Sequence, residues 1–282
     1  MKQIKSKFVA FSWMLTAMLT LSLATFPNSA CAAPDDEVYS PELVKRAEQG
    51  DAEAQSKLGY CYLSGDGVEQ DFDEAVKWLR KAVAEQEVAS AQCLLGICYQ
   101  EGYGVSQDDE EAFKWFSKAA GQGFAPAQYH LGCCYLLGRG ISKDYYEAVK
   151  WYRRAAEQGD EDAQAQLGVC YLEGTGVSKD YNEAVKWLRL AAEQGQLTAQ
   201  YNLGNCYYHG EVISQDYNEA VKWFRLAAEQ GDSDAQFNLG VCYMNGQGVA
   251  KNVNEGIKWY RKAAEQGDED AINRLKELGV AE

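Results

Sequence analysis

The sequence is poor in basic residues, and this scarcity excludes one large class of partner. Its 27 lysines and arginines stand against 42 acidic residues, which leaves a formal net charge of −15. Proteins bind nucleic acids through clusters of Lys and Arg that displace counterions from the phosphates. No basic stripe runs along this chain. We therefore expect no nucleic-acid partner, and we expect most of the acids to be solvated helix faces and helix caps.

Catalytic motifs are absent as well. The chain contains no Ser-x-x-Lys, Lys-Thr-Gly, Gly-x-Ser-x-Gly, His-Glu-x-x-His or Gly-x-x-x-x-Gly-Lys sequence. We expect a protein that is not an enzyme, with no catalytic residue and no cofactor.

Histidine is scarce too, with only His130 and His209 in the chain. His130 and Cys133 lie three residues apart, and together with Cys93 and either Cys98 or Cys134 they suggest a zinc or copper site as an alternative. Their spacing differs from that of the standard zinc fingers, and we therefore expect no metal.

Long apolar runs are missing except at the N-terminus. Three lysines among the first seven residues precede an uncharged, largely apolar stretch, residues 8–25, and Ala30-Cys31-Ala32 offers a small-residue cleavage site. This order of segments predicts a signal peptide, residues 1–32, and a protein exported to the periplasm or secreted. The run is near the lower length limit for crossing a bilayer, so an uncleaved anchor is the alternative. Beyond this export signal we expect no membrane contact.

A repeat of 36 residues dominates the rest of the chain. Leu-Gly pairs recur six times, and six tryptophans follow with the same steps: Leu58-Gly59, Leu95-Gly96, Leu131-Gly132, Leu167-Gly168, Leu203-Gly204 and Leu239-Gly240, with Trp78, Trp115, Trp151, Trp187, Trp223 and Trp259. Such a period indicates a solenoid, in which each unit buries its apolar face only against its neighbours. We predict an all-α array of six antiparallel helix pairs over residues 47–275. A tail and the start of a capping helix occupy 33–46, and the end of a C-terminal capping helix occupies 276–282.

The third unit illustrates the expected pair. Apolar spacing predicts a first helix from about Ala125 to Leu137, ended by Gly138, and a second helix that starts at Asp144. Gly132 is expected to let the second helix approach closely. In every unit an Asp or Asn precedes a Glu by three residues, which predicts a capping box, where the cap side chain and the Glu satisfy amide groups reciprocally. These pairs are Asp71/Glu74, Asp108/Glu111, Asp144/Glu147, Asp180/Glu183, Asp216/Glu219 and Asn252/Glu255.

Six of the nine cysteines occupy one repeat position, two residues after the glycine. Equivalent residues of stacked helices lie about 10 Å apart, beyond the reach of a disulfide. We therefore expect buried free thiols at Cys61, Cys98, Cys134, Cys170, Cys206 and Cys242. Cys31 is expected to leave with the signal peptide, and a disulfide between Cys93 and Cys133 is an alternative.

The repeated segments Ala199-Gln200-Tyr201-Asn202-Leu203-Gly204 and Asp180-Tyr181-Asn182-Glu183-Ala184-Val185-Lys186-Trp187 resemble the Sel1-like repeat. The resemblance covers about residues 47–275. It implies a tetratricopeptide-like, right-handed superhelix with a concave inner face. It also implies a scaffold that binds proteins or peptides in bacterial envelope, secretion or host-interaction roles.

A cysteine-rich branch of this family implies an alternative function, the binding or slow hydrolysis of β-lactams. In that branch two cysteines eight residues apart join each second helix to the next first helix. This chain has Ala120 and Gln128, Ala156 and Gln164, and Ala192 and Gln200 at those positions, so the bridge is absent.

Comparison of the six units indicates where a partner would bind. By the tetratricopeptide analogy, the first helix presents residues to the concave side three before, one after and four or five after the glycine. These positions vary while the framework does not. They are largely aromatic and aliphatic, with Asp162 and Glu173 nearby, which suits a peptide of apolar and basic character. We predict partner-binding residues Tyr129, Leu136, Val169, Leu172, Tyr201, Asn205, Tyr208, Phe237, Val241 and Met244.

Overall fold

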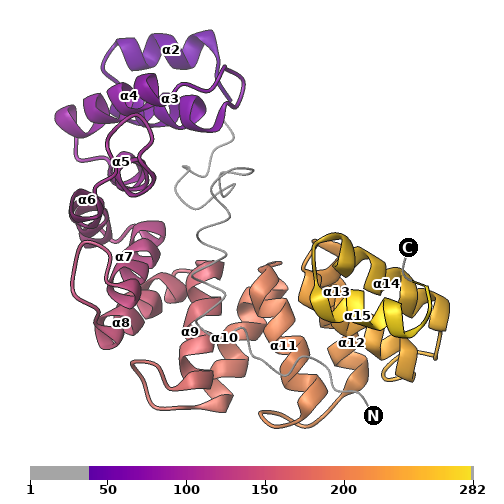
Figure 1. Ribbon diagram of the computed structural model, residues 1–282. Coiled ribbons are helices and arrows are strands. Elements are labelled where there is room, and N and C mark those ends of the chain that lie inside the picture. The colour runs from indigo at the N-terminus through magenta and orange to yellow at the C-terminus, as the bar shows by residue number, and fades with distance from the viewer. Residues whose placement is uncertain (1–37, 281–282) are drawn as a thin grey trace. The chain divides into compact units, whose positions relative to one another are not determined.

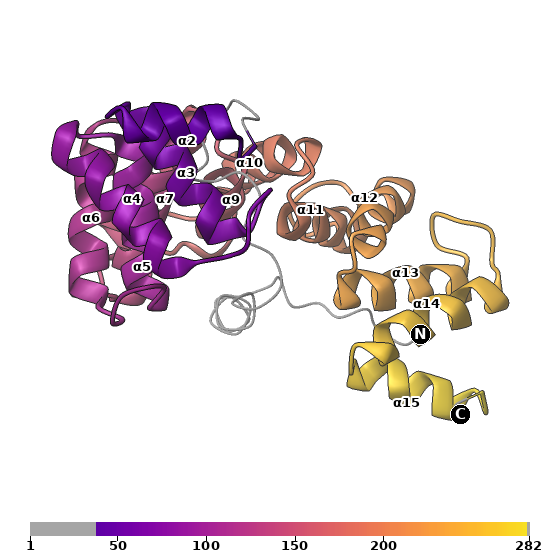
Figure 2. The same ribbon diagram turned by 90° about the horizontal axis from the view of Figure 1, so that it is seen from above.

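The computed structural model describes residues 38–280, and every regular element among them is an α-helix. The predicted signal peptide lies outside these residues. They form two compact units, residues 38–160 and 161–280. In each unit consecutive helices lie side by side (Figures 1 and 2). Within the described range, no helix combines the length and the apolar character that a membrane span requires.

Fourteen helices in the described range confirm the predicted organisation of six pairs between single helices at the two ends. The end helices are α2 (Pro41–Glu48) and α15 (Glu269–Glu277). The pairs are α3 (Ala52–Ser64) with α4 (Phe72–Glu85), α5 (Ala89–Glu101) with α6 (Asp109–Gly121), α7 (Ala125–Leu137) with α8 (Tyr145–Glu157), α9 (Glu161–Glu173) with α10 (Tyr181–Glu193), α11 (Leu197–His209) with α12 (Tyr217–Glu229) and α13 (Ser233–Asn245) with α14 (Val253–Glu265). We call the first member of each pair helix A and the second helix B.

The helix ends are where the sequence predicts them. Gly138 ends α7 in the left-handed conformation with φ 74°, which only glycine adopts without strain. The Asp144 side chain accepts hydrogen bonds from the backbone N–H groups of Tyr146 and Glu147, both at 3.0 Å, and so starts α8. Ser40 caps α2 in the same way, with Pro41 at the first helical position.

The predicted reciprocal half of the capping box is wrong. In each B helix the Glu forms an ion pair with a Lys three residues later, as Glu111 does with Lys114 at 2.7 Å. The N–H of the cap residue donates instead to a helix A carbonyl, as from Asp108 to Tyr99 at 2.9 Å. The cause is tertiary, because the tight loop brings the last turn of helix A against the start of helix B.

Helices A and B approach each other closest at the repeated glycine. A Cβ atom at Gly132 would lie 2.6 Å from Cε1 of Tyr152, well inside van der Waals contact. Tyr152 is fully buried, so its ring has no room to retreat. The predicted role of Gly132 is therefore confirmed.

A ladder of glutamines joins successive pairs within each unit. The Gln200 side chain on α11 donates to the Ala192 carbonyl at the end of α10 (3.2 Å) and accepts from Gln230 after α12 (2.8 Å). Gln236 repeats both bonds one pair later, to Ala228 and from Gln266. Because Gln200 is buried, its hydrogen bonds are shielded from water and link three helices.

Replacing Gly132 with Ala tests the close approach of the two helices. We expect Gly132→Ala to lower the free energy of unfolding by about 1–3 kcal/mol, because the added methyl overlaps the buried Tyr152 ring. Gly121→Ala is the matched control, since a Cβ there meets no atom within 4 Å. It should cause no loss and up to about 1 kcal/mol of gain. Urea unfolding measures both, and equal effects of the two variants would contradict the assignment.

The two members of the predicted capping box should differ in their contributions to stability. Asp216→Ala removes hydrogen bonds to the N–H groups of Asn218 and Glu219 and should destabilise the protein by about 1 kcal/mol. Glu219→Ala removes only an exposed ion pair with Lys222 and should change stability by less than about 0.5 kcal/mol. Thermal unfolding of the two variants distinguishes them, and a larger loss for Glu219→Ala would support the reciprocal box instead.

Candidate binding surface

The ten predicted binding residues all lie on A helices, but they are divided between the two units. Tyr129 and Leu136 belong to α7 in the unit 38–160. The other eight lie on α9, α11 and α13 in the unit 161–280: Val169, Leu172, Tyr201, Asn205, Tyr208, Phe237, Val241 and Met244. The structure thus brings together eight of the ten within one unit.

Seven of the ten side chains are buried, and Tyr129, Tyr208 and Met244 are partly exposed. The position three before the glycine packs on helix B of its own pair. Tyr201 lies 6.2 Å from Phe224, and Phe237 stacks on Tyr260 at 5.4 Å, between ring centroids. These rings therefore help to form the core, and the binding role of the ten residues stays a prediction.

Two further residues of the A helices are partly exposed, although they are not in the predicted set. Tyr60 on α3 and Ile97 on α5 occupy the position one after the glycine, and both are partly exposed. Together with Tyr129 they place a partly exposed large side chain on each of the three A helices of the unit 38–160. The comparison of the six repeats also shows these large residues one position after the glycine. It could not select them, because the exposure of that position differs from one pair to the next.

Polar groups lie among the apolar ones on the A helices of the second unit. The Tyr208 hydroxyl donates to Oε1 of Gln247 at 2.8 Å, and burial raises the pKa of Tyr208 to about 12. Nδ2 of Asn238 donates to Oδ1 of Asn205 at 3.4 Å. Burial raises the pKa of Asp162, which accepts a hydrogen bond from Gln196, and that of Glu173. Such carboxylates favour a cationic group that comes close enough to pair with them.

The cysteines at the repeated position are buried free thiols, as predicted. Burial raises the pKa of Cys98, Cys134, Cys206 and Cys242 to about 12, which keeps these thiols protonated and unreactive. The alternative of a Cys93–Cys133 disulfide is wrong, because Cys133 is free.

The residues of the alternative metal site around His130 make other contacts. The His130 ring stacks on Phe116 at 4.8 Å, and burial of its side chain lowers the pKa of His130 to about 4. Cys133 accepts a hydrogen bond from the Tyr152 hydroxyl at 3.4 Å. Across the described residues, no group of three or more His, Cys, Asp or Glu side chains gathers in a way that could hold a metal ion.

Stacked antiparallel helix pairs with a constant framework and variable helix A positions define a helical-repeat scaffold, a fold typical of protein-interaction modules. The family that matches is the Sel1 repeat, at residues 52–86, 89–124, 125–160, 161–196, 197–232 and 233–268. These six matches cover most of the chain, which therefore belongs to the Sel1 repeat family. Each match begins at or near the start of a helix A and extends past the end of the following helix B.

Two solved structures illustrate the similarity. A protective antigen present in uropathogenic Escherichia coli strains is 38% identical over 87% of this chain and 53% of its own, with a TM-score of 0.76. The chain thus spans about half the length of that antigen. A Sel1 repeat protein from Oxalobacter formigenes is 39% identical over 79% of this chain and 87% of its own, with a TM-score of 0.69. No curated protein sequence matches the chain.

Thiol labelling tests the burial of the repeated cysteines. With a pKa of about 12, only about one thiol in ten thousand is ionised at pH 8, compared with about a quarter in an unfolded chain. Ellman's reagent should therefore label these cysteines slowly in the native protein and rapidly in guanidinium. Ser142→Cys, at an exposed position, is a positive control that should react at once. Rapid native labelling of Cys206 or Cys242 would contradict the structure.

Proposed function

We propose that the chain is a non-catalytic scaffold of the bacterial cell envelope, or a secreted one, that binds a protein or peptide along its A helices. The observation that carries this proposal is the contrast between two sets of positions on the same helices. The repeated Leu, Gly and Cys are buried in every pair and hardly vary. Partly exposed large side chains occupy positions where other pairs hold small or polar residues, as Tyr129 corresponds to Ser56, Cys93 and Ala165.

The chemistry of these positions suggests a partner with apolar anchors and basic groups. Tyr60, Ile97 and Tyr129 offer aromatic and aliphatic surface in the first unit. Burial raises the pKa of Tyr60, and the negative charge of the nearby Asp66 carboxylate raises it further. A chain with a net charge of −15 also attracts cationic partners at long range.

The β-lactam alternative depends on the bridges of the cysteine-rich branch. Where such a bridge would join Ala120 to Gln128, Nε2 of Gln128 donates to the Ala120 carbonyl at 3.4 Å. The same contact joins Gln200 to Ala192. Hydrogen bonds therefore make the connection that cysteines make in that branch, and no observation favours a hydrolase.

Affinity capture from the native envelope tests the proposed surface. The mature chain serves as bait, next to a Tyr60→Ser/Tyr129→Ser variant and a Tyr181→Ser control, since Tyr181 is exposed on a B helix. We expect specific partners captured by the wild type and the control to be depleted about tenfold with the double variant, because about 1.4 kcal/mol of contact is lost.

Equal capture by all three proteins would contradict the proposal, because binding would then lie elsewhere on the surface. If the double variant has an altered melting temperature, the comparison is repeated with Tyr60→Phe/Tyr129→Leu, which removes the hydroxyls, and with Tyr129→Gln, which removes the ring. Unchanged capture with both of these variants would also contradict the proposal. Cell fractionation tests the exported location, and a cytoplasmic mature chain would contradict it.

A further inference from the structure

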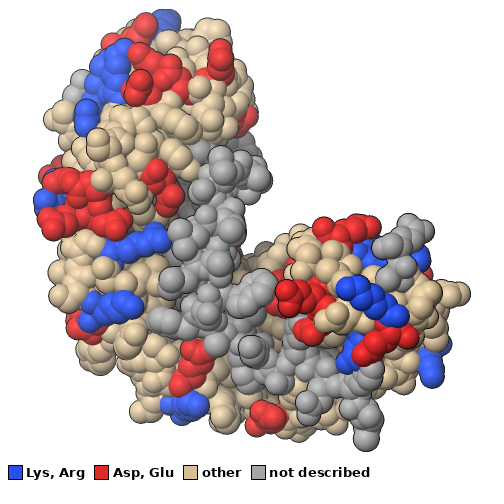
Figure 3. All heavy atoms as spheres, in the orientation of Figure 1, with Lys and Arg blue, Asp and Glu red and all other residues tan. Residues whose placement is uncertain are grey.

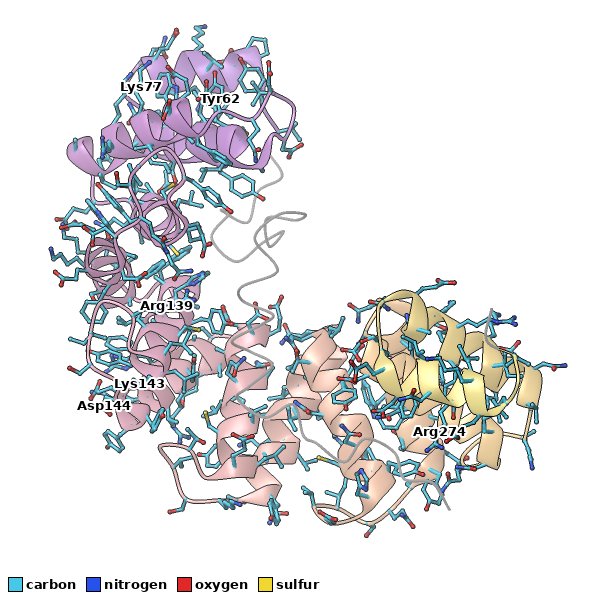
Figure 4. All side chains as sticks on the ribbon, in the orientation of Figure 1. Tyr62, Lys77, Arg139, Lys143, Asp144 and Arg274 are labelled. Carbon is cyan, nitrogen blue, oxygen red and sulfur yellow. The ribbon has the colours of Figure 1, made fainter. Side chains whose placement is uncertain are left out.

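The third helix pair differs from the other five in charge. Residues 125–160 contain five basic and four acidic residues, and every other pair has at least as many acids as bases. This local excess lies in a chain with a net charge of −15. Two of the five basic residues, Arg139 and Lys143, lie in the loop between α7 and α8, just before Asp144 (Figure 4), and the other three lie on α8.

The same loop and the first residues of α8 carry exposed apolar side chains. Residues 141–146 are all exposed, including Ile141 at 38% and Tyr146 at 70%. Tyr146 has no role in the core, and the five equivalent positions hold Asp73, Glu110, Asn182, Asn218 and Asn254. Tyrosine and arginine are both enriched at the centres of protein interfaces.

An acidic strip, formed by Asp109 and Glu110, lies directly beside the basic and aromatic strip formed by Arg139, Ile141, Lys143 and Tyr146. Gly140 packs so closely on the start of α6 that a Cβ there would overlap the Asp109 carbonyl. Asp109 and Glu110 follow Asp108, the cap of α6, and Figure 3 shows acidic and basic patches next to one another on this unit. Among the described residues, no ion pair joins Arg139 or Lys143 to Asp109 or Glu110.

We propose that this edge of the unit 38–160 is a contact surface for a second copy of the chain. In a two-fold dimer each copy presents the same patch, rotated by 180° relative to the other. The basic strip of one copy can then face the acidic strip of the other. Arg139 and Lys143 of one copy face Asp109 and Glu110 of the other, and Tyr146 and Ile141 pack in the centre. The Asp144 carboxylate stays on its own helix, because it accepts from the N–H groups of Tyr146 and Glu147.

The neighbouring acids argue for this occupant over an anionic membrane. Juxtamembrane binding needs clusters of about 4–8 basic residues, and here Asp109 and Glu110 would repel the headgroups. The patch is much smaller than the roughly 20–30 residues a side of a standard interface. The dimer is therefore weak, and because its charges are exposed it weakens further as salt screens them.

Sedimentation velocity of the mature chain over a range of concentrations tests the proposal. We expect the mean mass to rise with concentration toward that of a dimer, and to fall again in high salt. Arg139→Glu/Lys143→Glu makes both strips acidic, and Asp109→Lys/Glu110→Lys makes both basic. Each variant alone should dimerise about tenfold more weakly, which corresponds to about 1.4 kcal/mol. An equimolar mixture of the two should recover a heterodimer, because every facing pair is again opposite in charge.

A matched control comes from the fourth pair. Lys179→Glu changes the residue equivalent to Lys143 and should leave the association unchanged. In the third pair, Tyr146→Asn inserts the residue found at this position in the later pairs and should weaken the association. Melting temperatures should stay within a few degrees, because each of these side chains is at least partly exposed. A chain that stays monomeric at every concentration overturns the proposal. A dimer that survives both charge reversals, or a mixture that recovers nothing, overturns it too.

Discussion

The fold depends on one steric constraint, the absence of a side chain on helix A opposite a large side chain on helix B. At each of the six repeated glycines, a Cβ atom would come within 2.5–2.7 Å of that side chain. The facing residue is Leu79, Phe116, Tyr152, Leu188, Phe224 or Tyr260. Leucine, phenylalanine and tyrosine all fit, because the glycine makes the space and the ring or branch fills it. The pair is thus insensitive to which large residue is present and sensitive to any addition at the glycine.

Apolar packing holds the two helices of a pair together, and polar side chains connect one pair to the next. The glutamine ladder supplies it, since Gln200 bonds both to the preceding B helix and to the residue that ends its own B helix. Buried hydrogen bonds of this kind are directional, and they set the register of one pair on the next. The resemblance to the cysteine-rich branch implies that disulfides do this elsewhere in the family. This chain reaches the same connectivity within each unit without redox chemistry, and its repeated cysteines remain buried thiols.

Stability depends on the framework positions of helix A, and the proposed function assigns recognition to the variable positions. The framework residues face helix B, and their role leaves them little freedom to change. The variable positions between them differ from pair to pair, as the partly exposed Tyr60 does on α3. A scaffold built in this way can alter its partners without altering its core, because substitutions at such positions leave the glycine contact and the glutamine ladder intact.

The sequence by itself determined the helices, their ends and their number. The 36-residue period, the Asp caps and the Gly stops are local signals, and local hydrogen bonding decides where a helix begins and ends. Even the burial of Cys206 and the space around Gly132 followed from helix periodicity.

The tertiary structure decided which partners the helix-end groups and the variable side chains contact. It gave the Asp108 amide to the Tyr99 carbonyl, because a loop brings that carbonyl within reach, and so left Glu111 to pair with Lys114 on its own helix. It also buried Tyr201 and left Tyr60 partly exposed. Residues at variable positions differ in exposure because exposure depends on neighbouring helices, whose contacts no single repeat encodes.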